Sequence, residues 1–513
     1  MPDSRKIHTI PIPRIGGLAI ALGVLIPLLM WAPRNDFIYA YIVSGAILVI
    51  FGLVDDLKGL DYRLKFLGQV LAALIMLFYG GIRITNLGTL LSYGTVLPDL
   101  LAVVLTLLVI VGVTNAINLS DGLDGLAGGI SLLGFFCIGF LAYLIQDNTV
   151  LLLSLAFVGA IFGFLRYNTY PASIFMGDTG SQLLGFSAIV LAIKVTQENV
   201  SVNPVLPLII MGFPILDTLT VMLERMKQGR SPFLPDKNHF HHRLISIGFF
   251  HTEAVVIIYL IQSLMIISAI LFRYYFAYQC FAGYLIFSAL FISVFAIADR
   301  KGFRVKRYHL IDHIIKGRLA NIRDKKLVIR ISFEISKVLI PLIFMFSCFL
   351  PREIPGYAIY VALGFGLLII VMRIFGKNAW SLGLRAALYL SIPLILYLSQ
   401  EGIADWIKPE IMMGYHIGLA VMAFFVILTI KFSRRSKGFH VTTMDFLVLF
   451  IAIVIPNLPI DSIQSHIVGM LVVKLIVILF SYEVLITELR GEFNALTVST
   501  LGGLAIIGVR GLM

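Results

Sequence analysis

Apolar stretches of about 17–22 residues recur along almost the whole chain and alternate with short polar segments. A helix rises about 1.5 Å per residue, so a stretch of this length crosses the roughly 30 Å hydrocarbon core of a bilayer. The pattern predicts an all-α, polytopic membrane bundle with about 16–17 transmembrane helices. The predicted spans are 16–32, 37–54, 65–81, 98–117, 125–145, 149–165, 180–196, 204–223, 252–272, 279–298, 331–351, 356–372, 386–399, 412–430, 443–459 and 466–486, with a glycine-interrupted stretch at 497–511.

The composition excludes a large soluble protein. Of the 513 residues, 59% are hydrophobic and only 13% are charged, and the mean hydropathy is +0.97. Soluble domains carry about 25% charged residues, so this chain cannot cover a water-facing surface. The three cysteines, Cys137, Cys280 and Cys348, lie inside apolar segments without metal-ligand spacing, and we interpret them as packing residues.

The distribution of basic residues sets the topology and divides the chain. With the N-terminus inside, only five Lys and Arg lie in outer loops: Arg34, Arg83, Arg273, Arg352 and Lys408. The inner segment 299–330 is strongly basic, and we interpret it as a cytoplasmic linker near anionic lipid rather than a nucleic-acid site. It separates a front domain, 1–298, from a back domain, 331–513, of unknown role.

Polar residues in the front domain gather on one predicted side of the membrane. The clusters are Asp55-Asp56, the segment 115–125, Asn168 with the segment 175–181, and the segment 239–243. The alternation of spans places all four at the cytoplasmic face. This one-sidedness predicts a single convergent site for a cytosolic substrate.

The residue types in these clusters indicate phosphate chemistry. Several carboxylates at the ends of apolar helices would repel one another without a cation, and Mg²⁺ prefers carboxylate and phosphate oxygens. Any single Asp could instead cap a helix or a turn. Three histidines beside Lys237 and Arg243 suit a pyrophosphate better than zinc, because no further ligand is near. Asp217, inside a predicted span, is equally compatible with a functional and a structural role.

Five stretches resemble the polyprenyl-phosphate N-acetylhexosamine-1-phosphate transferases, which form glycosyltransferase family 4. They are PRIGGLAI, VDDLKGLDYRLKFLGQ, NAINLSDGLDGLAGG, RYNTYPASIFMGDTGS and PDKNHFHHRL, in the family's order across roughly residues 5–250. The HxHHR form is similar to the branch that uses UDP-N-acetylglucosamine. Family members usually carry one more membrane helix before the first stretch, and the back domain matches no family motif.

The resemblance implies a role for each matched residue. Asp178 and Asp121 would ligate Mg²⁺, with Mn²⁺ as the alternative ion. The remaining assignments are catalytic groups near the lipid phosphate (Asp55, Asp56), catalytic histidines that with Lys65 would hold phosphate oxygens (His239, His241, His242), nucleotide contacts (Asn118, Asp121, Asp124), a uracil-stacking ring (Phe175), a supporting or substrate contact (Asn168) and further substrate-binding residues (Asn115, Arg243).

The expected reaction is transfer of N-acetylglucosamine-1-phosphate from UDP-GlcNAc to undecaprenyl phosphate, with release of UMP. Two alternatives remain open: the same reaction with another UDP-N-acetylhexosamine or UDP-MurNAc-pentapeptide, and a lipid or sugar transporter. The expected location is the bacterial plasma membrane, and the expected role is the first membrane step of cell-envelope polysaccharide assembly, such as lipopolysaccharide O-antigen or teichoic acid. No nucleic-acid partner is expected. The chain could form a homodimer, and its back domain could dock another envelope enzyme.

Overall fold

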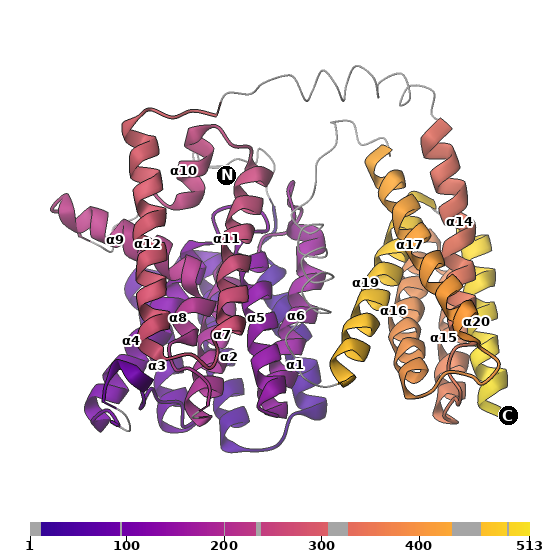
Figure 1. The fold of residues 1–513 in the computed structure, drawn as a ribbon, viewed down its shortest axis with the longest axis horizontal. Coiled ribbons are helices and arrows are strands. Elements are labelled where there is room, and N and C mark those ends of the chain that lie inside the picture. The colour runs from indigo at the N-terminus through magenta and orange to yellow at the C-terminus, as the bar shows by residue number, and fades with distance from the viewer. Residues whose placement is uncertain are drawn as a thin grey trace. The chain divides into compact units, whose positions relative to one another are not determined.

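The protein is an all-helical membrane protein. The computed structural model describes residues 12–92, 95–199, 201–231, 238–305, 327–432, 463–489 and 492–512. Within these residues there are helices and two isolated β-bridges, and no strand. The described helices form two compact units, one within residues 12–305 and one within 327–512 (Figure 1). The predicted linker 299–330 contains this division, and its residues 306–326 lie outside the described residues.

The first unit contains a bundle of apolar helices and two shorter helices, α8 and α10. Its elements are α1 (Gly16–Trp31), α2 (Asp36–Lys58), α3 (Tyr62–Phe78), the 3₁₀ turn η1 (Gly88–Leu90), α4 (Asp99–Leu119), α5 (Leu126–Leu144), α6 (Asn148–Asn168), α7 (Gly177–Glu198), α8 (Leu206–Ile210), α9 (Gly212–Lys227), α10 (Phe240–Ile247), α11 (His251–Leu271) and α12 (Ala277–Arg300).

The centre of this unit is formed by α5 and α7. Of the most apolar stretch of each helix, 89% is buried in α5 and 94% in α7. Helix α7 packs against α1, α2, α4 and α5. We call the end of the unit at which α2 and α4 finish and α3 and α7 begin the site end. The N-terminus of the central helix therefore opens at the site end among the ends of its neighbours.

Local sequence signals fix where α2 begins and ends. The side chain of Asn35 accepts a hydrogen bond from the backbone N–H of Ile38 and caps the helix. At the other end Gly59 adopts a φ of +69°, which glycine tolerates, and its N–H donates to the carbonyl of Asp55. The stop after Lys58 holds the Asp55-Asp56 pair in the last turn of α2.

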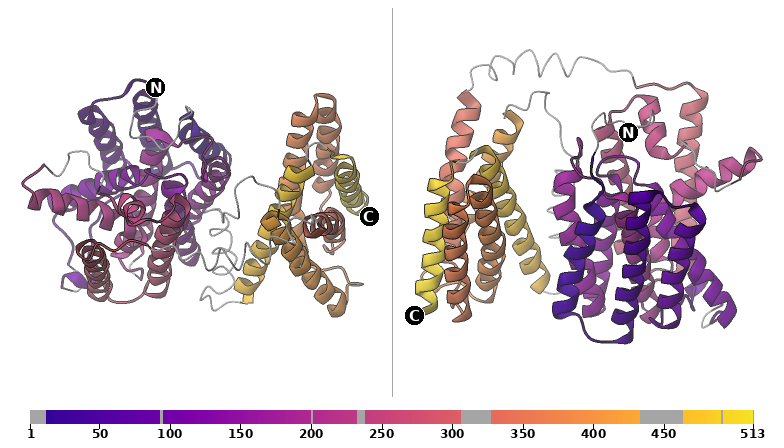
Figure 2. Two further views of the ribbon diagram at one scale, coloured as in Figure 1. Left: turned by 90° about the horizontal axis from the view of Figure 1, so that it is seen from above. Right: turned by 180° about the vertical axis from the view of Figure 1, so that it is seen from behind.

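The predicted span 204–223 is not one helix, and this part of the prediction was wrong. The structure breaks it at Met211 into the short α8 and the longer α9. Helix α9 projects sideways from the bundle, as Figure 2 also shows. The close contact of Gly212 with its neighbours explains why no side chain stands there, because a Cβ would lie 2.5 Å from the sulfur of Met265.

The second unit is a separate helical bundle with its own apolar core. Its described helices are α14 (Leu327–Ser347), α15 (Tyr357–Ile374), α16 (Lys377–Glu401), α17 (Pro409–Phe432), α19 (Ile463–Leu489) and α20 (Asn494–Leu512). A bidentate ion pair joins Arg385 of α16 to Glu483 of α19, with N–O distances of 2.9 and 3.1 Å. Tyr389 donates a further hydrogen bond to Glu483.

The number of membrane-spanning helices was only approximately predicted. Among the described helices, eleven are long and apolar enough to cross a membrane, and α1 is a shorter apolar helix. The doubtful stretch at 497–511 is one of the eleven, within α20. The predicted span 443–459 lies outside the described residues.

Candidate active site

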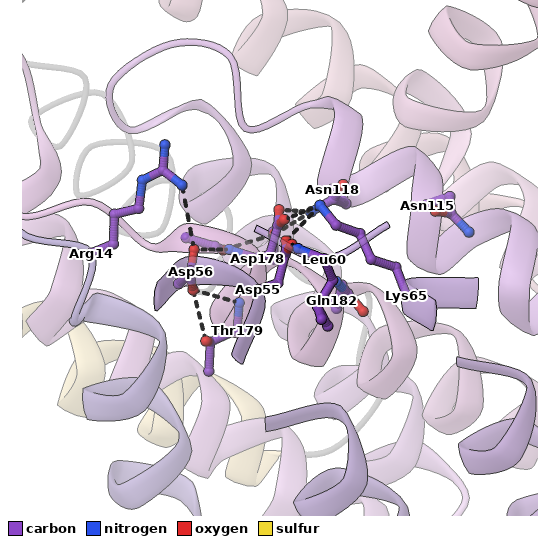
Figure 3. Close-up of polar contacts among 12 residues, drawn as sticks. Arg14, Asp55, Asp56, Leu60, Lys65, Asn115, Asn118, Asp178, Thr179 and Gln182 are labelled. Carbon is purple, nitrogen blue, oxygen red and sulfur yellow. Dashed lines mark hydrogen bonds and ion pairs between the residues drawn. The ribbon is translucent and has the colours of Figure 1, made fainter. Parts of the chain in front are cut away.

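The centre of the site is one ammonium group held between two carboxylates. Lys65, in the first turn of α3, lies 2.5 Å from an oxygen of Asp55 and 2.7 Å from an oxygen of Asp178 (Figure 3). The second oxygen of Asp178 accepts a hydrogen bond from the amide of Asn118, at 2.7 Å. The second oxygen of Asp55 accepts from the backbone N–H of Leu60, at 2.6 Å. The ends of α2, α3, α4 and α7 thus meet through four predicted site residues.

Asp56 has a different environment from Asp55, although the two are adjacent. One of its oxygens accepts from the N–H of Asp178 at 3.0 Å. The other accepts from both the N–H and the hydroxyl of Thr179, at 3.1 and 2.8 Å. The Arg14 guanidinium lies 3.7 Å away. The Asp56 carboxylate therefore caps the N-terminus of α7, where the helix dipole favours a negative charge.

Gly177 makes this cap sterically possible. Its φ is +71°, and a Cβ there would lie 2.4 Å from an oxygen of Asp56. A glycine lets the carboxylate approach the first turn of α7 closely. The sequence GDTG thus combines the glycine, the carboxylate of Asp178 and the hydroxyl of Thr179 in one short segment.

Asn115 lies one helical turn before Asn118, in a buried amide network. Its amide donates to the side-chain oxygen of Gln69 at 2.6 Å, and the Gln69 amide lies 3.3 Å from the oxygen of Gln182. Gln69 and Gln182 were not predicted as site residues. The sequence could have identified them, since both are polar residues inside apolar helices and need a hydrogen-bond partner there. The network fixes α3, α4 and α7 relative to one another.

The loop between α4 and α5 contributes two aspartates with unlike surroundings. Asp124 accepts from the N–H of Ala172 at 2.9 Å and so holds the loop that precedes α7. Within the residues that the structure describes, no hydrogen-bond partner of the Asp121 carboxylate is found. Burial raises the pKa of Asp121 to about 7, and the charges of Asp178 and Asp56 add to this effect. The positive charge of Arg14 opposes these effects only in part.

Asn168 ties the same two loops together from the end of α6. Its side-chain oxygen accepts from the N–H of Gly125 at 2.9 Å, and its amide donates to the carbonyl of Ile174 at 2.9 Å. Asn168 is 2% exposed, and its two hydrogen bonds hold the two loops together. The backbone of Phe175 lies beside the first described segment, where its carbonyl accepts from the N–H of Gly16.

The histidine segment is anchored by Asp217 of α9. His239 Nδ1 lies 2.9 Å from one oxygen of Asp217, and the N–H of Phe240 donates to the other at 2.8 Å. A carboxylate only accepts, so Nδ1 carries the proton and Nε2 of His239 is the nitrogen turned away from this contact. Asp217 therefore orients the histidine segment, a role that the sequence left undecided.

His241 faces the loop between α4 and α5. A Cβ on Gly122 would lie only 2.3 Å from its Nε2, so the absence of a side chain at Gly122 permits this contact. Nε2 is buried and has no hydrogen-bond partner among the described residues. Burial, together with His242, lowers the pKa of His241 to about 3, so the ring is neutral near pH 7.

His242 and Arg243 complete the segment. The rings of His241 and His242 have centroids 4.2 Å apart. Arg243 forms an ion pair with Glu224 of α9, and its Nε donates to the carbonyl of Asn238. This arginine is thus linked to α9, while the predicted substrate contact of its side chain stays a prediction.

A hard divalent cation fits the chemistry of this end of the bundle. Asp55, Asp121 and Asp178 supply carboxylate oxygens, of which Lys65 pairs with those of Asp55 and Asp178, while the Arg14 charge acts on Asp121. In the part of the chain that is described, no three His, Cys, Asp or Glu side chains are arranged as a ready metal cage. Mg²⁺ usually takes one or two carboxylates together with phosphates and water, so a preformed cage is not required.

Comparisons with known proteins identify the family of this chain. The family model described as glycosyl transferase family 4 matches residues 38–196, which include Asp55, Lys65, Asn118 and Asp178. A Bacillus subtilis protein is 39% identical over 274 residues, covering 53% of this chain and 76% of the relative. The chain belongs to glycosyl transferase family 4. The Bacillus relative is named probable undecaprenyl-phosphate N-acetylglucosaminyl 1-phosphate transferase.

Two further members of the family show the same relationship. The decaprenyl-phosphate N-acetylglucosaminephosphotransferase of Mycolicibacterium smegmatis is 37% identical over 294 residues, covering 50% of this chain and 71% of the relative. The undecaprenyl-phosphate alpha-N-acetylglucosaminyl 1-phosphate transferase of Escherichia coli K12 is 28% identical over 320 residues, covering 61% and 85%. The membership expected from the five motifs is confirmed.

Proposed function

We propose that this protein transfers N-acetylglucosamine-1-phosphate from UDP-GlcNAc to undecaprenyl phosphate and releases UMP. The observation that carries the proposal is the Lys65 ammonium between Asp55 and Asp178, inside the segment that matches the family. The printed names of the relatives support the lipid acceptor and the sugar.

The reaction exchanges one phosphoanhydride bond for another. An oxygen of the lipid phosphate forms a bond to the β-phosphorus of the UDP-sugar, and the bond from that phosphorus to the bridging oxygen breaks. UMP leaves with the bridging oxygen. The lipid phosphate is largely ionised at pH 7, since the second pKa of a phosphate monoester is about 6. Catalysis then depends mainly on alignment and on neutralisation of charge.

The residues of this chain divide these tasks. Lys65 supplies a positive charge within reach of phosphate oxygens, and Asp55 holds that ammonium in place. Asn118 orients the Asp178 carboxylate through its amide. The neutral His241 beside Gly122 can offer a ring nitrogen to a polar substrate group. We further propose that Asp178 and Asp121 hold Mg²⁺, or Mn²⁺, which when bound neutralises the pyrophosphate charge.

The proposal includes the location of the chain. We infer that it spans the bacterial plasma membrane with the site end on the cytoplasmic face, where the UDP-sugar is available. The distribution of Lys and Arg supports this orientation. A homodimer, and docking of another envelope enzyme by residues 331–513, stay predictions.

The test is UMP release by the purified protein with UDP-GlcNAc, undecaprenyl phosphate and Mg²⁺. We expect release that depends on both the lipid and the metal and that is lost in Asp178→Asn. Replacing UDP-GlcNAc by other UDP-sugars measures sugar preference in the same assay. Absence of UMP with every UDP-sugar, from protein that remains folded, would overturn the proposal.

A further inference from the structure

A cavity of about 500 Å³ lies in the first unit, between α8, α11 and α12. Its walls are mainly apolar and aromatic, and include Ile209, Met265, Phe272, Tyr284 and Phe287. The space is partly open to the surface, so it is a recess in the helix bundle and not an enclosed void. A recess of this size, lined by side chains that suit hydrocarbon, fits part of a lipid tail.

The cavity lies far from the site end along α11. This helix begins beside the site, where the ring nitrogen of His251 accepts from the N–H of Asp124. The lining residues on α11 start at Leu264, 13 residues later (264 − 251). At about 1.5 Å per residue this is roughly 20 Å, more than half of a hydrocarbon core about 30 Å thick. The cavity is thus in the half of the membrane opposite the site.

The wall of the cavity is connected to the site through α9. The Tyr284 hydroxyl donates to the carbonyl of Gly212 at 2.9 Å, and the Met265 sulfur lies close to the same glycine. Gly212 begins α9, which carries Asp217 and so positions the histidine segment. Helix α9 therefore contacts the cavity wall at its first residue and carries Asp217 five positions later.

We propose that this cavity holds a distal part of the prenyl tail of the lipid substrate. The inference rests on the proposed function, which anchors the lipid phosphate at the site end. A chain anchored there reaches the opposite half of the membrane only if it is longer than the acyl chains of one leaflet, and a polyprenyl chain is. Lipid tails already surround the prenyl chain, so the cavity would select it by packing rather than by the hydrophobic effect.

The consequence is selection for chain length. A short prenyl phosphate would reach the site but not the cavity, whereas a long one would make both sets of contacts. The cavity would therefore contribute to the KM for a long acceptor and not to that for a short one. It would leave the transfer step itself unchanged.

Gly283 of α12 offers a selective perturbation. It lines the cavity, and no atom lies within 4 Å of a Cβ built there, so Gly283→Leu places a side chain in the free space. Gly159 of α6 is a matched control, because it is also helical with nothing within 4 Å of its Cβ and does not line the cavity. Ser268→Leu is a second cavity variant on α11.

The measurement compares undecaprenyl phosphate with a three-isoprene prenyl phosphate in the UMP assay. We expect both cavity variants to raise the KM for the long acceptor about three- to tenfold, with kcat and the KM for the short acceptor unchanged, because only packing contacts are lost. Gly159→Leu should match the wild type. Equal KM values for the long acceptor in wild type and both cavity variants would overturn the inference, as would the same increase for both acceptors.

A binding experiment separates this inference from the proposed reaction. An undecaprenyl phosphate with a photoreactive group at the far end of its tail should cross-link to peptides of α11 or α12, less so in Gly283→Leu. Cross-links only to other helices would contradict a prenyl tail in the cavity. That result is also the one expected if a membrane phospholipid fills the cavity instead. Cross-links to α11 or α12 without UMP formation would leave the lipid site standing and remove the proposed reaction.

Discussion

The replacement Asp56→Asn tests whether Asp56 holds the fold or acts on the substrate. The Asp56 carboxylate uses both oxygens to accept from the backbone N–H groups of Asp178 and Thr179. An asparagine keeps one oxygen and places an NH₂ group where the other was. At least one backbone donor at the start of α7 then faces another donor instead of an acceptor.

The size of the effect follows from these contacts. A buried donor left without its acceptor costs about 1–3 kcal/mol. Loss of a negative charge at a helix N-terminus costs about 0.3–1 kcal/mol more, and up to about 2 kcal/mol when the site is partly buried. We therefore expect Asp56→Asn to lower the free energy of unfolding by roughly 2–4 kcal/mol. This corresponds to a fall in the apparent Tm of roughly 5–10 °C for a unit of this size.

Asp147→Asn is the matched control. Asp147 caps α6, but one of its oxygens accepts from both Thr149 and Val150, so asparagine can preserve the cap. Thermal unfolding in detergent, followed by light scattering and tryptophan fluorescence, should show a large shift for Asp56→Asn and a small one for Asp147→Asn. An unchanged Tm for Asp56→Asn together with lost UMP release would refute the cap and assign Asp56 to the substrate.

Three further predictions address charge at the site, pH and the second unit. Lys65→Met removes the cation between two carboxylates and should lower UMP release about 100-fold or more, while Lys65→Arg should retain part of it. The pKa of His241 is depressed, so the unfolded state binds more protons, and the free energy of unfolding should fall as pH drops from about 6.5 toward about 3. His241→Gln should flatten that dependence in denaturation measured at several pH values. Arg385→Met removes the ion pair of Glu483 but leaves the hydrogen bond from Tyr389, and should lower the free energy of unfolding by about 1–2 kcal/mol, whereas adding Glu483→Gln should recover part of the loss.

The general architecture was predictable because it follows from local patterns. Apolar length predicted helices that cross a membrane, and the distribution of polar residues predicted one site formed by the ends of several helices. The break at Met211 was not predictable from apolar length, because both halves of 204–223 are apolar. Gly212 and Pro214, in the first turn of α9, were the available signal, since proline is tolerated in the first turn of a helix and not in its interior. The tight contact between Gly212 and α11 leaves no periodic signal in the sequence.

The roles of individual residues were less predictable than their presence at the site. Asp55 and Asp56 are identical in type and adjacent, and one binds a lysine while the other caps a helix. The cap formed by Asp56 depends on Thr179, which is 123 residues away from Asp56 in the chain. The pairing of His239 with Asp217 likewise joins a loop to a helix that the sequence could only describe as containing a buried carboxylate. Such roles are set by the direction in which each side chain leaves its helix, and composition carries no information about that direction.

The aspartates of the site end fall into two groups, and this division indicates which of them are free of a structural role. Three accept from backbone N–H groups of other segments: Asp56 from α7, Asp124 from Ala172 and Asp217 from Phe240. These carboxylates hold the loops and helix ends in position and cannot leave their partners without disturbing the site. Among the described residues, no backbone N–H of a distant segment donates to the other three, Asp55, Asp121 and Asp178, and Lys65 forms ion pairs with two of them, Asp55 and Asp178. An anionic substrate pair would add negative charge beside these three carboxylates, so we expect it to bind together with a cation that they help to hold.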